Sequence, residues 1–239
     1  MISRSGLIAG AVGVLVGGSA VALWAGAGSG GGSRAQVETI IHDYLLENPE
    51  ILVEASEKLR DRETGKLVDA NRAAIETPFA GAWAGAEKGD VVLVEFFDYA
   101  CGYCRKSNED VDRLLKEDPK LKVVWREWPV LGPDSEAAAQ VSLAAAKQGK
   151  YRAFFHALFA AGRPTAAAVA EAQRTAGVSA EAVAAVQGGA AVQELSKNHE
   201  IARGLQATGT PTFVVGDKVL QGAVGYEVLK AAIAEAREG

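Results

Sequence analysis

The residues best suited to chemistry are two cysteines in the tetrapeptide Cys101-Gly102-Tyr103-Cys104, and the 239-residue sequence contains no others. A spacing of two residues lets the thiols close a small disulfide ring and open it again. Exchange needs a thiolate that attacks and a second thiol that resolves the mixed disulfide. The pair therefore predicts redox chemistry, with Cys101 as the attacking thiol and Cys104 as the resolving one.

Two other uses of the pair stay open. A static disulfide across so short a loop would stabilise the fold only slightly. A zinc site needs further ligands, and the histidines at 42, 156 and 199 lack metal-ligand spacing, which leaves a half-site shared between subunits. We expect redox activity, no metal site and no cofactor.

The elements around the cysteines follow from the hydrophobic pattern. Residues 91–97 form a nearly continuous apolar run, typical of a strand buried on both faces, and residues 122–128 predict a second strand. Residues 105–116 between them have helical spacing. In such a βαβ unit Cys101 lies at the helix N-terminus, where the helix dipole stabilises a thiolate.

The rest of the chain predicts mainly helices. Residues 134–207 are rich in alanine and predict four or five helices, followed by a hairpin of strands 212–215 and 218–221 and a last helix over 226–237. Before a small-residue linker at 78–89, residues 35–74 predict two acidic amphipathic helices that restart at Asn48-Pro49. Their apolar stripes favour either self-association through 35–75 or an amphipathic spacer.

The N-terminus predicts export. Residues 7–25 are uncharged and apolar, which fits a membrane anchor or a signal peptide, and residues 26–33 read as a flexible tether. Arg4 predicts that the bulk of the chain lies outside the cytoplasm. We expect three regions: an anchor or signal with tether at 1–34, a helical extension at 35–80 and a compact domain at 81–239.

Composition excludes some classes of protein. A hydrophobic content of 49% argues against a disordered chain, and a net charge of −5 argues against a general affinity for nucleic acid.

Two motifs carry a family resemblance. EFFDYACGYC and, more than a hundred residues later, GTPTFVVGDKVLQG resemble the exported disulfide oxidoreductases of the DsbA family over residues 90–237. The segment YLLENPEILVEA is similar to the N-terminal region of ScsC-like and Com1-like members. The resemblance implies an α/β thioredoxin fold with a helical insertion between the βαβ unit and the cis-Pro hairpin, preceded by an N-terminal helical extension.

The resemblance also implies roles for particular residues. Pro211 would be the cis-proline that faces the disulfide, and Thr210 would pair through its backbone with the substrate chain. Glu95 would be a buried acid that exchanges the proton of Cys104, since burial raises a carboxyl pKa; the alternative is an exposed strand face. Gly102 and Tyr103 would tune the redox potential, and they are similar to the dipeptide of the isomerase DsbC.

We therefore expect a periplasmic disulfide isomerase or reductase that assists protein folding. The alternatives are a general thiol oxidase and, from a different class, a copper-binding or holdase module. Expected partners are cysteine-containing exported proteins, a DsbD-like reductase or DsbB-like oxidase in the membrane, and further copies of the chain through 35–75. Residues 7–25 would tether the protein to the inner membrane unless the leader is cleaved.

Overall fold

The computed structural model describes residues 33–187 and 189–238, which divide into two compact units after Ser56. The expected anchor or signal and almost all of the tether lie outside the described residues. Among the helices within 33–187 and 189–238, none has both the length and the apolarity needed to cross a membrane.

The first unit contains α2 (Arg34–Glu47) and the start of α3 (Glu50–Glu76). A capping box begins α2, because the Ser33 hydroxyl accepts from the backbone of Gln36 while the Gln36 side chain accepts from the Ser33 backbone. No residue of α2 is buried. Its exposed apolar side chains include those at 37, 40, 41, 44 and 46.

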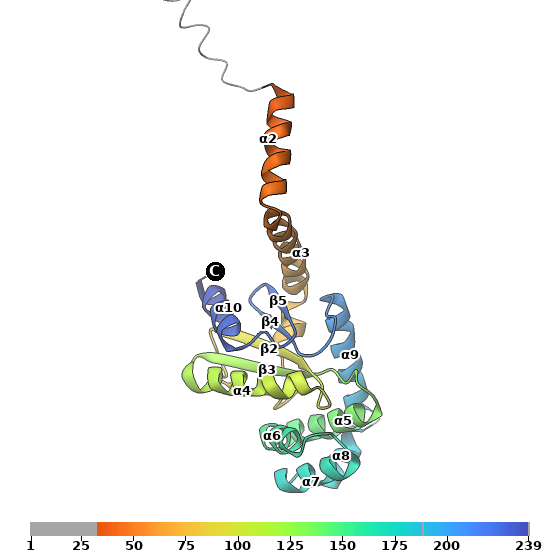
Figure 1. Cartoon of the computed structure of the whole chain (residues 1–239). Helices are drawn as coiled ribbons and strands as arrows, with labels where there is room; N and C mark the ends of the chain where they lie inside the picture. Colours follow the sequence, from red (N-terminus) through yellow and green to blue (C-terminus); the bar gives the residue numbers. More distant parts are fainter. Residues whose placement is uncertain (1–32, 188, 239) are drawn as a thin grey trace, which may run out of the picture. The chain divides into compact units, whose positions relative to one another are not determined.

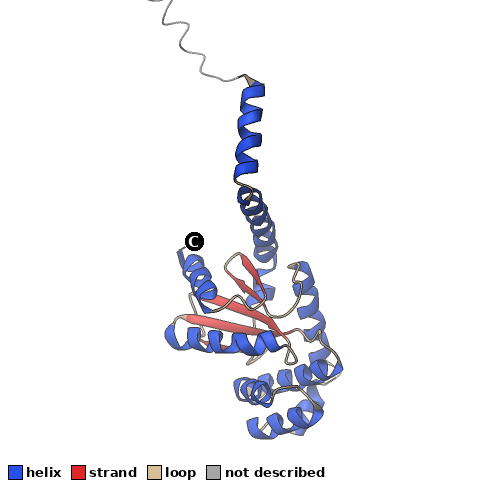
Figure 2. Cartoon of the chain, in the orientation of Figure 1, coloured by secondary structure: helices blue, strands red, loops and turns tan. Residues whose placement is uncertain are grey.

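The second unit is built on a five-stranded sheet with the order β1-β3-β2-β4-β5, drawn in red in Figure 2. Its strands are β1 (Trp83–Gly85), β2 (Val91–Phe97), β3 (Leu121–Glu127), β4 (Thr212–Val215) and β5 (Lys218–Gln221). The central strands β2 and β3 run parallel, joined by α4 (Gly102–Glu117), whereas β1, β4 and β5 pair antiparallel. This confirms the predicted βαβ unit and the predicted hairpin.

Two apolar cores cover the two faces of the sheet. Figure 1 labels the helices that pack around the sheet. One core joins the sheet to α4, to the helical insertion and to α10 (Tyr226–Glu238). The other includes Val68 and Ile75 of α3 and Ala202 of α9. The insertion runs through α5 (Pro133–Lys147), α6 (Tyr151–Ala161), α7 (Ala166–Ala176), α8 (Ala180–Val186) and α9 (Ala190–Gly204).

The fold class is therefore the one expected, and the differences are local. The stretch predicted as a linker contains β1, which pairs with β3, and α4 begins three residues earlier than the helical spacing indicated. The strand predicted to end at Trp128 ends at Glu127.

Candidate active site

The cysteine pair lies where β2 passes into α4. Cys101 is the N-cap of α4, and the Cys104 backbone N–H donates to its sulfur over 3.4 Å. Both cysteines are free thiols and both are buried, with 6% of Cys101 and 0% of Cys104 exposed. The helix N-terminus thus supplies N–H donors and a positive dipole end to the sulfur of Cys101.

This environment favours the Cys101 thiolate. Hydrogen bonds, first from the Cys104 thiol and then from the Thr210 side chain and the α4 backbone, lower the pKa of Cys101 to about 5 in spite of partial burial. At neutral pH the sulfur is then almost wholly ionised and is the nucleophile of the pair.

Cys104 and Glu95 form the buried half of the site. Burial is the main cause that raises the pKa of Cys104 far above its ordinary value, and the hydrogen bond to Cys101 and the charge of Glu95 add to it. Glu95 is fully buried in the centre of β2, and burial raises its pKa to about 8. A carboxyl with such a pKa can gain or lose a proton near neutral pH.

The loop that opens β4 faces the cysteines. The peptide bond between Thr210 and Pro211 is cis. When protonated, the Cys101 thiol donates to the carbonyl oxygen of Thr210 over 3.2 Å. The structure thus brings these predicted residues to Cys101, whereas 69% of Tyr103 is exposed and Gly102 lies at the surface.

Asp98 is a residue of the site that sequence analysis did not single out. Its buried carboxylate accepts from the backbone of Ala100 and from those of Val130 and Leu131, over 2.7, 2.8 and 2.9 Å, and from the Ser135 hydroxyl over 2.6 Å. It ties the loop before Cys101 to the loop after β3. The available signal was an aspartate directly after a buried strand and before the cysteines.

Strand β3, which pairs with β2, carries further buried polar groups near the site. The indole of Trp125 contacts Glu95, and the Tyr151 hydroxyl donates to Glu127 over 3.0 Å. Burial raises the pKa of Glu127 to about 8, so that carboxyl is largely protonated at neutral pH. The signal in the sequence was two charged residues, Arg126 and Glu127, at the end of the second predicted strand.

A buried thiol pair at a helix N-terminus on this sheet defines a thioredoxin-fold oxidoreductase site. The family model of the DSBA-like thioredoxin domain matches residues 92–234, which is more than half of the chain. The chain therefore belongs to the DsbA-like thioredoxin family of thiol-disulfide oxidoreductases. A second model, the copper resistance protein ScsC N-terminal domain, matches residues 34–64. Both resemblances read from the sequence are confirmed.

Solved structures agree with this family. A thioredoxin-like oxidoreductase from Silicibacter pomeroyi is 37% identical, with a TM-score of 0.67 over 71% of this chain and 99% of that one. Proteus mirabilis ScsC in a transitional conformation is 26% identical, with a TM-score of 0.66 over 85% of this chain and 94% of that one. The thiol-disulfide exchange protein alpha-DsbA2 from Wolbachia pipientis is 26% identical, with a TM-score of 0.68 over 74% of this chain and 97% of that one.

The curated relatives are named as Na+/H+ antiporters and not as oxidoreductases. The Na+/H+ antiporter NhaA 3 of Salinispora tropica is 33% identical over 69 residues, which are 28% of this chain and 11% of the antiporter. NhaA 1 of Salinispora arenicola is 28% identical over 163 residues, which are 65% of this chain and 24% of the antiporter. The chain thus spans less than a quarter of the length of these relatives.

Proposed function

We propose that the protein is a disulfide isomerase or reductase of exported proteins. Cys101 would attack a client disulfide, and Cys104 would resolve the mixed disulfide with Glu95 as proton acceptor. The backbone of Thr210, beside Pro211, would pair with the client chain. The observation that carries the proposal is the thiolate environment of Cys101, whose pKa is lowered to about 5.

That pKa also supports a direction. A nucleophile with a pKa of about 3.5 accompanies the strong oxidant DsbA, at about −120 mV, and one of about 7 accompanies the reductant thioredoxin, at about −270 mV. A value of about 5 for Cys101 lies between these two pKa values, which supports a reduction potential between the two potentials. The pair would then stay partly reduced, as isomerisation requires.

The test is the reactivation of ribonuclease with scrambled disulfides. We expect the reduced protein to restore ribonuclease activity in a glutathione buffer at several times the rate of the buffer alone. Efficient oxidation of reduced ribonuclease without reactivation of the scrambled form would favour the oxidase instead. A tight stoichiometric Cu(I) site in a protein without reductase activity would favour the copper-binding module.

An assembly of several copies would place several sites around one client. The exposed apolar side chains of α2, among them Ile40 with 67% and Leu46 with 69% exposed, support self-association through this extension. As a second arm of the same test, Ile40→Glu should be a monomer by light scattering. This monomer should reduce insulin at the parent rate but should no longer reactivate scrambled ribonuclease. Val192→Glu, at an exposed valine of α9, is the matched control and should change neither.

The proposed setting is the periplasm. An apolar segment at residues 7–25 with Arg4 before it supports export, with the chain held at the inner membrane or released after cleavage. A DsbD-like membrane reductase would then keep Cys101 and Cys104 reduced.

A further inference from the structure

Glu95 is held by one neighbour that the exchange chemistry does not by itself require. In the parallel pairing of β2 and β3, Trp125 lies in register with Glu95, so both side chains point to the same face of the sheet. The Trp125 indole N–H donates to Oε2 of Glu95 over 3.0 Å. The other oxygen, Oε1, is buried and has no hydrogen-bond partner among the described residues.

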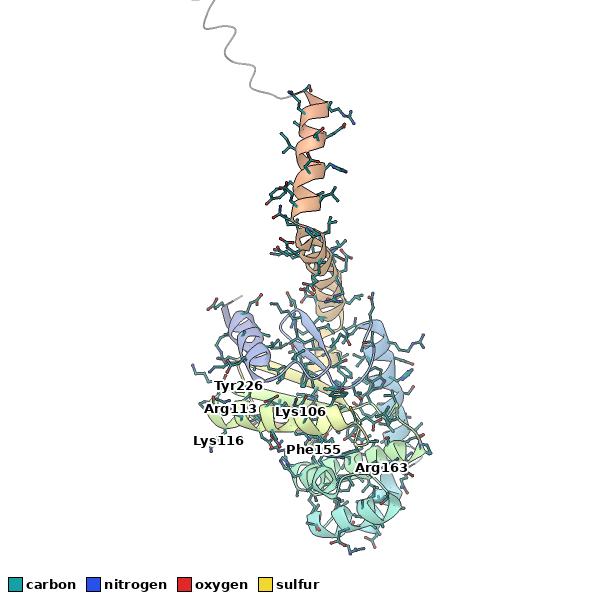
Figure 3. All side chains as sticks on the ribbon, viewed as in Figure 1. Lys106, Arg113, Lys116, Phe155, Arg163 and Tyr226 are labelled. Atoms are coloured by element: carbon teal, nitrogen blue, oxygen red, sulfur yellow. The ribbon has the colours of Figure 1, made fainter. Side chains whose placement is uncertain are left out.

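The indole is itself fixed from its other side. Its ring packs on the ring of Phe155 at 5.2 Å between centroids, a residue of α6 labelled in Figure 3. The Arg152 guanidinium lies 4.7 Å from the centre of the indole and donates to Asp112 of α4 over 2.9 Å. A cation on the ring face and an aromatic neighbour leave the indole little freedom to turn away from Glu95.

We propose that Trp125 is a positioning residue for the resolving step: its N–H holds Oε2 of Glu95 and leaves Oε1 to take the proton of Cys104. This inference rests on the proposed function. In the mixed disulfide, the Cys104 thiol gives its proton to Glu95, and its sulfur attacks the sulfur of Cys101. The Cys101–Cys104 bond forms, the bond from Cys101 to the client breaks, and the client leaves as a thiolate that takes a proton. The pair is oxidised by two electrons and the client disulfide is reduced.

The contact also sets the pH at which Glu95 can act. A donor to a carboxylate stabilises the charged form, so the hydrogen bond from Trp125 lowers the pKa of Glu95 against the larger effect of burial. The titratable and charged groups that face Glu95 or its indole partner are Cys101 at the N-cap of α4, Cys104 and Asp112 of α4, Glu127 of β3, and Tyr151 and Arg152 of α6. Within the part of the chain that the structure describes, Trp125 is the one residue whose side chain donates a hydrogen bond to Glu95.

The test is single-turnover reduction of a fluorescently labelled peptide disulfide by the full chain between pH 5 and pH 10. Its first phase, formation of the mixed disulfide, reports Cys101, and its second phase, release of the peptide thiol, reports Cys104 and Glu95. In Trp125→Phe we expect an unchanged first phase. The second phase should be slower by roughly threefold to tenfold at pH 7, with its pH profile displaced to higher pH, because ionised Glu95 has lost its donor.

Three variants separate positioning from a structural effect. Trp128→Phe removes an indole that donates to His199 on the opposite face of the sheet, over 3.2 Å, and should leave both phases unchanged. In a Glu95→Gln background, Trp125→Phe should slow the second phase no further. Arg152→Lys keeps the positive charge but loses the planar guanidinium that lies over the indole. It should displace the profile in the same direction by less, which tests the inference even if Trp125→Phe fails to fold.

Two results would overturn the inference. One is a second-phase pH profile that stays in place in both Trp125→Phe and Arg152→Lys while the first phase is normal. The other is an equal slowing by Trp125→Phe in the parent and in the Glu95→Gln background. A parent chain that forms no mixed disulfide at all would contradict the proposed function itself, and the inference with it, and is recognised by the missing first phase.

Discussion

Cys101→Ser is expected to reduce thiol–disulfide exchange to the background of the buffer, because a hydroxyl does not replace the thiolate that attacks. Cys104→Ser keeps the attacking thiol at the N-terminus of α4 and replaces the Cys104 thiol by a hydroxyl that can still donate a hydrogen bond to it, but it removes the thiol that resolves the intermediate. The Cys104→Ser protein should therefore accumulate mixed disulfides with its clients. These appear as reductant-sensitive adducts on non-reducing gels of the exported proteins.

The control is built into the sequence. The chain has two cysteines, so the double variant Cys101→Ser/Cys104→Ser contains no thiol and reports adducts that do not involve this protein. Adducts that form in Cys101→Ser but not in Cys104→Ser would reverse the assigned roles. Equal trapping by both single variants would mean that neither thiol is protected by burial, against the 0% exposure of Cys104.

Arg126→Met is expected to lower the free energy of unfolding by about 3–5 kcal/mol, which is typical of removing one partner of a buried ion pair. The Arg126 side chain is 1% exposed and pairs with Glu194 of α9 over 3.0 Å. It also donates to Asn198 over 2.7 Å and, over 2.7 Å each, to the carbonyls of Ile75 and Thr77 at the end of α3. Its loss would leave a buried carboxylate and helix-end carbonyls without their donor.

Urea unfolding of the full chain measures this effect. Arg174→Met is the matched control, because Arg174 pairs with Glu171 within one exposed turn of α7, with 68% of its side chain accessible, and should cost less than about 1 kcal/mol. Arg126→Lys keeps the positive charge but lacks the planar guanidinium, so its loss of unfolding free energy should lie between those of Arg126→Met and Arg174→Met. A loss in Arg126→Met no larger than that in Arg174→Met would show that this residue does not join α3, β3 and α9.

The parts of the fold and site that could be predicted from the sequence are those with a strong local pattern. The run at 91–97 forms β2 at those residues because it is apolar throughout, and the hairpin strands 212–215 and 218–221 follow from Gly216-Asp217 between them. The N-terminal position of Cys101 on α4 follows from the strand that ends just before it. Glu95 lies buried as expected, because its neighbours on both sides along β2 are large and apolar.

The parts that were missed depend on pairing between distant residues. The contact of Trp125 with Glu95 follows from the register of β2 on β3, which no local pattern encodes. Strand β1 has three residues, too few to show a period of two. Arg126 is informative only once the end of α3 and helix α9 are known to lie on the same face. In each case the physical cause is a tertiary contact, and the local sequence shows only one of the two partners.

We propose that Cys101 and Cys104 form a redox pair whose reduction potential lies between those of strong oxidants and strong reductants. The most direct test is the reduction potential of residues 35–239, read in glutathione redox buffers by the change in Trp fluorescence or by trapping of free thiols. From the lowered pKa of Cys101, we predict a reversible two-electron couple with a potential between about −270 mV, as in thioredoxin, and about −120 mV, as in DsbA. A value near about −120 mV would favour the thiol oxidase, and the absence of any reversible couple would contradict the enzyme altogether.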